Sequence, residues 1–218
     1  MFLTETSLWT SNDQDNWKDV ENAYWDSKTV KRCESLYREL DAVDSNVIKN
    51  YTAEEFYNFL HDKYYVWKFT DKRILPNCQH YLSRHKDDFS DFSKRQKAIF
   101  NFDLNDINAG IKCFTDSKTR IGGMAVSAGS GLLSLLFPEY FGTVDLFVVL
   151  FLQKVDGISD RVMQIKEPRN LKPAEAALLI QLMRDKANKL NEANATTYWT
   201  PRRIDKCLWS FREYQKKF

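Results

Sequence analysis

Apolar residues recur at helical spacing along most of the chain. Thr52-Ala53-Glu54-Glu55 reads as a capping box, with Phe56, Phe59 and Leu60 following three or four residues apart. The same spacing predicts further helices over about 73–86, 89–102, 104–116 and 126–137, and after Lys172-Pro173 and Thr200-Pro201. Alternating runs of β-branched residues and Asn-Gly turns are scarce. The pattern therefore predicts an all-α protein.

Some element boundaries are predicted by single residues. Asp103 or Asn105 is expected to cap the helix over 104–116, which carries Ile107 and Ile111 on one side. The polar segment 155–172 is expected to form a long surface loop.

The apolar stretch 132–152 raises the question of a membrane span. Glu139 and Asp145 are its only charged residues, and Pro138 and Gly142 lie between the two apolar halves. A spanning helix would bury both carboxylates and a helix break near mid-bilayer, which is costly. Two buried segments joined by a turn are therefore predicted, with no membrane partner.

Composition and charge are those of a globular protein with an uneven charge distribution. The 218 residues are 43% apolar, include 15 Phe, 10 Tyr and 6 Trp, and carry a net charge of +2. Residues 1–60 are acidic and residues 161–218 are basic. The basic residues of 161–218 either form one face that binds a polyanion or lie on ordinary solvated helix faces. We expect residues 1–60 to be an acidic helical extension packed on a domain over 61–218.

The cysteines and the start of the chain add two expectations. Cys33, Cys78, Cys113 and Cys207 lie too far apart for a zinc or iron–sulfur motif, so no metal site is expected. The first residues do not follow the pattern of a signal peptide, so a cytoplasmic location is expected.

Four of the seven glycines gather between two predicted helices. They are Gly122, Gly123, Gly129 and Gly131. The first pair supplies the backbone freedom of a tight hairpin, and backbone amides at the start of the following helix are suited to a phosphate. By itself such a segment is most often only a turn between packed helices. It lacks the Lys-Ser/Thr pair of a Walker loop and the spacing of a nucleophile elbow.

An aspartate precedes the second apolar helix. Gly142-Thr143-Val144 leads into Asp145, and Leu146-Phe147-Val148-Val149-Leu150-Phe151-Leu152 follows. Asp145 is either a plain helix N-cap or a carboxylate held by amides in an apolar setting, which is suited to chemistry.

Together these motifs resemble the helix-hairpin-helix (HhH-GPD) DNA glycosylase superfamily. The family pattern begins with Leu-Pro-Gly-Val-Gly, followed by one further residue and then Lys or Ser. An apolar helix and an aspartate come next. In this chain the matching residues are Ile121-Gly122-Gly123-Met124-Ala125-Val126-Ser127 and Asp145. The resemblance covers about 103–152. Gly122 replaces the family's Pro, Ala125 its second Gly, and Ser127 stands at the position of the Schiff-base Lys.

The resemblance implies a glycosylase-like helical fold and a DNA partner. A hairpin over 118–127 would hold one backbone phosphate, with a monovalent cation as the only cofactor. The residues implied there are Gly122, Gly123, Met124, Ala125 and Ser127. Asp145 would be the catalytic carboxylate in hydrolysis of the N-glycosidic bond of a flipped-out base. Because Ser127 cannot form an imine, the enzyme would be monofunctional and leave an abasic site in an intact strand.

Lesion removal in DNA repair is the usual task of that family. Excision of modified bases from phage DNA, as an anti-phage defence, is the second role that the family's breadth implies. We expect the protein to act as a monomer.

Two further groups are candidate contacts. Tyr65, Trp67 and Lys68 lie in an aromatic segment that either lines a base pocket or, more commonly, belongs to a core. Arg202 and Arg203 lie in the first turn of the last helix, where the helix dipole disfavours cations. They either meet a phosphate or are solvated.

Two other functions stay open. The chain could be a catalytically silent DNA-binding relative, in which Asp145 is only a cap, or a helical protein–protein interaction module. Asp145→Asn separates the enzyme from the silent relative, because it would stop base release and spare DNA binding. Salt-dependent affinity for DNA separates both from the interaction module.

Overall fold

The computed structural model describes residues 3–158 and 160–216, and these form helices and connecting loops without a strand, which confirms the all-α prediction. The first helices are α1 (Glu5–Thr10), α2 (Gln14–Asp26), α3 (Lys28–Lys31), α4 (Glu34–Asp41), α5 (Ser45–Lys49) and α6 (Ala53–Asn58). There follow a π-helical turn η1 (Phe59–Tyr64), α7 (Tyr65–Lys68), α8 (Ile74–Ser83), a 3-10 turn η2 (Arg84–Asp87) and α9 (Phe89–Phe100). The remaining helices are α10 (Ile107–Thr115), α11 (Val126–Leu136), α12 (Leu146–Leu152), α13 (Asp160–Met163), α14 (Pro173–Ala193) and α15 (Pro201–Gln215).

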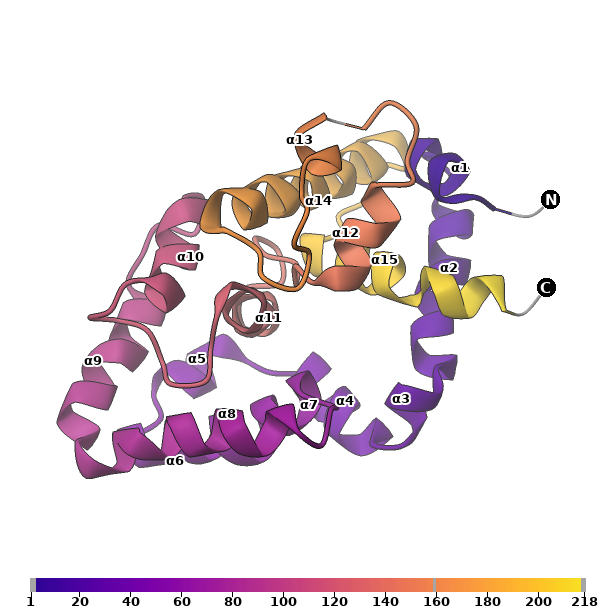
Figure 1. Ribbon diagram of the computed structural model, residues 1–218. Coiled ribbons are helices and arrows are strands. Elements are labelled where there is room, and N and C mark those ends of the chain that lie inside the picture. Colours follow the sequence, from indigo (N-terminus) through magenta and orange to yellow (C-terminus); the bar gives the residue numbers. More distant parts are fainter. Residues whose placement is uncertain (1–2, 159, 217–218) are drawn as a thin grey trace.

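Helix α11 lies at the centre of the molecule, with the other helices arranged around it (Figure 1). All of its residues except Ser127 are buried, and it packs against α10, α14 and α15. A helix that is apolar on every side is stable only inside a core, which explains why this segment is so hydrophobic. Gly129 permits the approach of α10, since a Cβ there would lie 2.3 Å from Cγ of Phe114.

Capping residues set the starts of several helices as predicted. Thr52 and Glu55 form the capping box of α6, and Thr200 caps α15 by accepting a hydrogen bond from the amide of Arg203. The two long C-terminal helices begin at Pro173 and Pro201, where the missing N–H costs no hydrogen bond.

Other predicted boundaries were wrong. The helix expected over 104–116 begins at Ile107, and its cap is Asp106, not Asp103 or Asn105. Asp103 instead accepts a hydrogen bond from the amide of Asn105 at 2.9 Å and so stabilises the preceding turn. The helix expected over 73–86 is α-helical only to Ser83 and tightens into η2, and the next ends at Phe100 and not at 102.

The segment 155–172 is not simply a loop. It contains the one-turn helix α13, whose Val162 is fully buried. Ser159, directly before α13, lies outside the described residues.

Residues 3–60 share one hydrophobic core with the other described residues. Helix α2 packs along α15, and the rings of Trp17 and Trp199 meet at 6.1 Å between centroids. The hydroxyl of Ser210 donates a hydrogen bond to the carbonyl of Val20 at 2.8 Å. The acidic N-terminal segment is thus placed directly beside the basic C-terminal helix.

The apolar stretch 132–152 is divided between α11 and α12, with a loop between them. Within the described residues, no helix combines the length and the apolar character needed to cross a membrane.

Candidate active site

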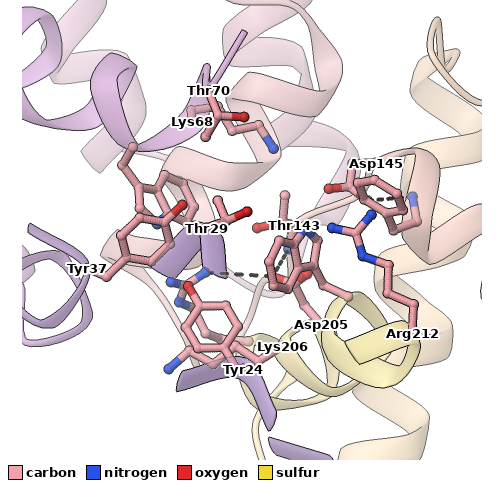
Figure 2. Close-up of a pocket in the computed structure, with 14 residues that line it drawn as sticks. Tyr24, Thr29, Tyr37, Lys68, Thr70, Thr143, Asp145, Asp205, Lys206 and Arg212 are labelled. Atoms are coloured by element: carbon pink, nitrogen blue, oxygen red, sulfur yellow. Dashed lines mark hydrogen bonds and ion pairs between the residues drawn. The ribbon is translucent and has the colours of Figure 1, made fainter. Parts of the chain in front are cut away.

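A cavity of about 250 Å³ opens where four parts of the chain meet. Its wall comes from α2 to α4, from the end of α7 and the loop after it, from the start of α12, and from α15 (Figure 2). The lining residues are Tyr24, Thr29, Tyr37, Trp67, Lys68, Thr70, Thr143, Asp145, Phe147, Arg202, Asp205, Lys206, Trp209 and Arg212. This volume is slightly below the roughly 300–1,000 Å³ of sites for drug-sized ligands, and suits a smaller group.

Aromatic rings form a continuous wall around the cavity. Trp67 meets Tyr37 at 6.2 Å between ring centroids, and Tyr37 meets Tyr24 at 6.1 Å. Tyr24 meets Trp209 at 5.5 Å, and Trp209 meets Phe147 at 6.4 Å. Such a wall offers stacking surfaces to a planar heterocycle.

Asp145 is the N-cap of α12 and lines this cavity. Its Oδ1 accepts hydrogen bonds from the amides of Phe147 at 2.9 Å and Val148 at 3.2 Å. Its Oδ2 makes no hydrogen bond to any described residue. The cap and the catalytic interpretation of Asp145 therefore concern different oxygens of one carboxylate and do not exclude each other.

Buried polar side chains fix the loop that leads to Asp145. The amide of Val144 donates to Oγ of Ser130 at 3.0 Å, and the amide of Thr143 donates to Oδ2 of Asp205 at 3.0 Å. Oγ of Ser134 lies 3.0 Å from Oγ1 of Thr143. The serines of α11 thus explain why polar residues interrupt its apolar sequence, since they hold the Asp145 backbone in place.

Asp205 is a second carboxylate in the cavity wall and is almost completely buried. Burial raises its pKa to about 6, although the nearby Arg202 guanidinium opposes this shift. Nη1 of Arg202 lies 3.6 Å from Oδ2 of Asp205 and donates a hydrogen bond to Oγ of Ser134 at 3.1 Å. The negative charge of Asp145 also raises the pKa of Asp205.

Cationic side chains outnumber carboxylates in the lining. Lys206 is paired with Asp41, and Arg202 lies 3.8 Å from the same carboxylate. Arg212 stacks on Phe147, with its guanidinium carbon 3.6 Å from the ring centroid. Lys68 is the fourth cation. Carboxylates in or beside the lining, Asp145, Asp205, Asp41 and Glu213, equal these cations in number, so the cavity has polar groups of both signs.

The predicted base-pocket and arginine contacts divide between the cavity and the surrounding structure. Trp67, Lys68 and Arg202 line the cavity, whereas Tyr65 and Arg203 do not. The Tyr65 hydroxyl donates to the carbonyl of Gly122, and Nη1 of Arg203 donates to Glu21 at 2.6 Å. Both arginines in the first turn of the last helix therefore have carboxylate partners within the protein.

The hairpin residues lie outside the cavity lining and pack against α8. A Cβ at Gly122 would lie 2.2 Å from the carbonyl oxygen of Tyr81, and one at Gly123 2.5 Å from that of Cys78. Gly123 has φ +79°, as the glycine pair predicts for a tight turn, while Gly122 does not have positive φ. Close packing thus requires both glycines, and the turn geometry requires the second.

Side chains from outside the hairpin hold it in place. The amide of Gly122 donates to Nε2 of His85 at 2.9 Å, so this amide is already occupied. Nη1 of Arg95 donates to the carbonyl of Arg120 at 2.6 Å. Met124 is buried within the turn, and its amide donates to the carbonyl of Ile121 at 3.1 Å.

The start of α11 leaves amides available. Ala125 is the N-cap residue and provides no side-chain cap, and the amides of Val126, Ser127 and Ala128 make no hydrogen bond to the described residues. Ala125 is exposed and Ser127 is half-buried. These amides are the part of the hairpin suited to an anion.

Sequence reasoning missed most of the cavity lining. The N-terminal contributors Tyr24, Thr29 and Tyr37 carry no motif that marks them. A sequence signal was present in α15, where five lining residues fall on one face of the helix, opposite its apolar stripe: Arg202, Asp205, Lys206, Trp209 and Arg212. A polar stripe on a largely buried helix indicates a polar cavity.

No group of three or more potential metal ligands occurs among the described residues, and their four cysteines are unpaired thiols. No model of a known protein family, no curated protein and no solved structure matches the chain.

Proposed function

We propose that the chain is a DNA glycosylase with the helix-hairpin-helix glycosylase fold. It hydrolyses the N-glycosidic bond of a damaged or modified base flipped into the cavity and leaves an abasic site. The observation that carries this proposal is Asp145, which lines an aromatic-walled cavity: its Oδ1 caps α12, and its Oδ2 makes no hydrogen bond to the described residues.

The cavity suits an extruded base. Trp67, Tyr37, Tyr24, Trp209 and Phe147 provide the stacking that offsets the few kcal/mol lost on unstacking a nucleotide. Lys68 and Arg212, two basic side chains of the cavity wall, would contact the phosphates on either side of the flipped nucleotide. At the hairpin, the free amides at the start of α11 would hold a further backbone phosphate, and the monovalent cation implied there stays part of the proposal.

Asp145 stabilises the transition state. As the C1′–N bond breaks, its electron pair goes to the base and positive charge develops on the sugar, which the carboxylate offsets. Water then adds to C1′ and gives its proton to Oδ2, the oxygen that makes no hydrogen bond to the described part of the chain.

Asp205 is suited to protonate the departing base. Its pKa of about 6 leaves part of the population protonated near neutrality, whereas an ordinary aspartate would be ionised. Two carboxylates in different environments can thus divide the acid and stabilising roles.

The test is release of free base, measured by chromatography, from duplexes carrying damaged, mismatched or phage-type modified bases. Native protein is expected to release at least one base, and Asp145→Asn to release it at least about 100-fold more slowly, with DNA affinity retained. Asp156→Asn, at an exposed aspartate, is the matched control. DNA binding without release across the panel would favour the silent relative, and no binding at low salt would favour the interaction module.

A further inference from the structure

His85 holds the hairpin through a hydrogen bond that its ring accepts. The residue lies in η2, and its Nε2 accepts the amide proton of Gly122 at 2.9 Å. A backbone amide can only donate, so this ring nitrogen carries no proton. The bond therefore exists only while the imidazole is neutral, with its single proton on Nδ1.

The chain has three histidines, and the other two have different surroundings. Nδ1 of His61 lies 2.6 Å from Oδ1 of Asp62, so a proton on that ring strengthens an existing contact. His80 is exposed, and its ring makes no hydrogen bond to the described residues. Uptake of a proton thus removes a backbone contact at His85 and at neither of the others.

Packing keeps the His85 ring directed at the hairpin. The ring lies against Phe92 of α9, with 5.0 Å between centroids, and Phe92 is fully buried. From the same helix, Nη1 of Arg95 donates to the carbonyl of Arg120 at 2.6 Å. The hairpin is therefore fastened to η2 and α9 at two points, the amide of Gly122 and the carbonyl of Arg120.

The surroundings of His85 oppose its charged form. Burial lowers its pKa below the ordinary 6.5, the charge of Arg95 acts in the same direction, and Asp91 opposes the shift. Both of these charged groups come from α9. Other charged residues on its own turn and in the hairpin shift its pKa no further: Arg84, Lys86, Asp87 and Arg120. The folded chain thus takes up this proton at a lower pH than the unfolded chain.

We infer that His85 is a positioning residue for the hairpin, and that its protonation releases the hairpin and weakens DNA binding in acid. The inference rests on the proposed function, in which amides beside the hairpin hold a backbone phosphate. Once the ring takes up a proton, two N–H groups face each other where one hydrogen bond was, and the Gly122 segment must move. The amides of Val126 and Ser127 lie only a few residues further along and lose their fixed positions.

The first test needs no DNA. The three histidine ring signals and the Gly122 amide are followed by NMR in the full chain between pH 7.5 and pH 5, with His80→Gln and His85→Gln to assign the rings. We expect the His85 ring to titrate below 6.5. Protection of the Gly122 amide against hydrogen exchange should fall at least about tenfold over the same interval. In His85→Gln, whose side-chain oxygen can accept the same bond and does not titrate, protection should persist.

The second test is DNA affinity at the two pH values and constant low salt. Native protein should lose affinity in acid by about fivefold or more relative to His85→Gln. The comparison is conservative, because the added positive charge by itself favours DNA. His85→Phe keeps the contact with Phe92 but has no acceptor, so it should bind weakly at both pH values. His80→Gln should follow native protein, and circular dichroism separates a loss of affinity from unfolding.

Several results would overturn the inference alone. They are a His85 ring that titrates at or above 6.5, protection of Gly122 that does not change with pH, and native affinity in acid equal to that of His85→Gln. Tighter binding by native protein than by His85→Gln in acid would make the imidazolium a phosphate ligand, which also contradicts a release. Absence of DNA binding at both pH values would instead overturn the proposed function, together with the effect on DNA inferred from it.

Discussion

Asp205 is the residue whose ionisation the fold most clearly opposes. Its pKa is raised from 3.8 to about 6 by burial. Below pH 3.8 the group is protonated in both the folded and the unfolded chain. As the pH rises through 6, the unfolded chain loses the proton first, so Asp205 lowers the stability of the fold by about 3 kcal/mol at neutrality.

Asp205→Asn should therefore gain stability relative to native protein as the pH rises. The amide keeps an oxygen acceptor for Thr143 and cannot ionise. Urea unfolding at pH 4 and pH 7 measures the difference. If the free energies of unfolding of the variant and the native protein differ by the same amount at both pH values, Asp205 has the pKa of an ordinary aspartate.

For individual residues, the sequence indicated part of the candidate site. Asp145, Trp67, Lys68 and Arg202 were candidates because a motif, an aromatic segment or a misplaced charge marked them, and all four line the cavity. Tyr65 and Arg203 have the same local signals but face other partners, since one residue along a helix rotates the side chain by about 100°.

At the scale of elements, the hairpin is held by contacts that only the fold supplies. Gly123→Ala should destabilise the protein by more than about 1 kcal/mol, because a Cβ would meet the carbonyl of Cys78 as well as adopt a positive φ. Gly157→Ala is the matched control. Its φ of +72° is similar, and nothing lies within 4 Å of the added atom.

Denaturant midpoints of the two variants measure this difference. The Gly157 variant should lose only the backbone preference of about 1 kcal/mol. Equal losses would show that the hairpin is not packed against α8 as described.

Helix boundaries were predictable where a local signal sets them. The capping box at Thr52 and the prolines at 173 and 201 act within one turn, and their helices begin as expected. The π-helical turn over Phe59–Tyr64 and the tightening after Ser83 have no such signal. The η1 turn is set by packing, which places Tyr64 and Tyr65 against the start of α11 and the hairpin.

For the whole molecule, Asp41 links the acidic N-terminal segment to the basic last helix. It pairs with Lys206 and lies 3.8 Å from Arg202, both of which are buried. Asp41→Asn would leave the buried Lys206 without its carboxylate partner, although Arg202 keeps Asp205, and should cost roughly 3 kcal/mol. The asymmetry of charge along the sequence is thus partly an internal ion-pair network.

Glu34→Gln provides the comparison for Asp41→Asn. Glu34 and Arg38 form an exposed pair on α4, which contributes about 0–1 kcal/mol. Chemical denaturation of both variants measures the two costs. A loss for Asp41→Asn no larger than that for Glu34→Gln would refute a structural role for this network.

The sequence does not predict which side chains the segment from α2 to α4 contributes to the cavity. Tyr24, Thr29 and Tyr37 line the same cavity as Trp67 and Asp205 because α2 packs along α15. Such long-range pairing depends on the whole fold, and no local pattern encodes it.

The most direct measurement of the central claim is single-turnover release of base by native protein and Asp145→Asn under matched conditions. We expect native release of at least one modified base, a loss of about 100-fold or more in the variant, and similar DNA affinity for both. Release by Asp145→Asn at the native rate would contradict the role given to this carboxylate. Absence of release by native protein from every duplex would contradict the proposed activity itself.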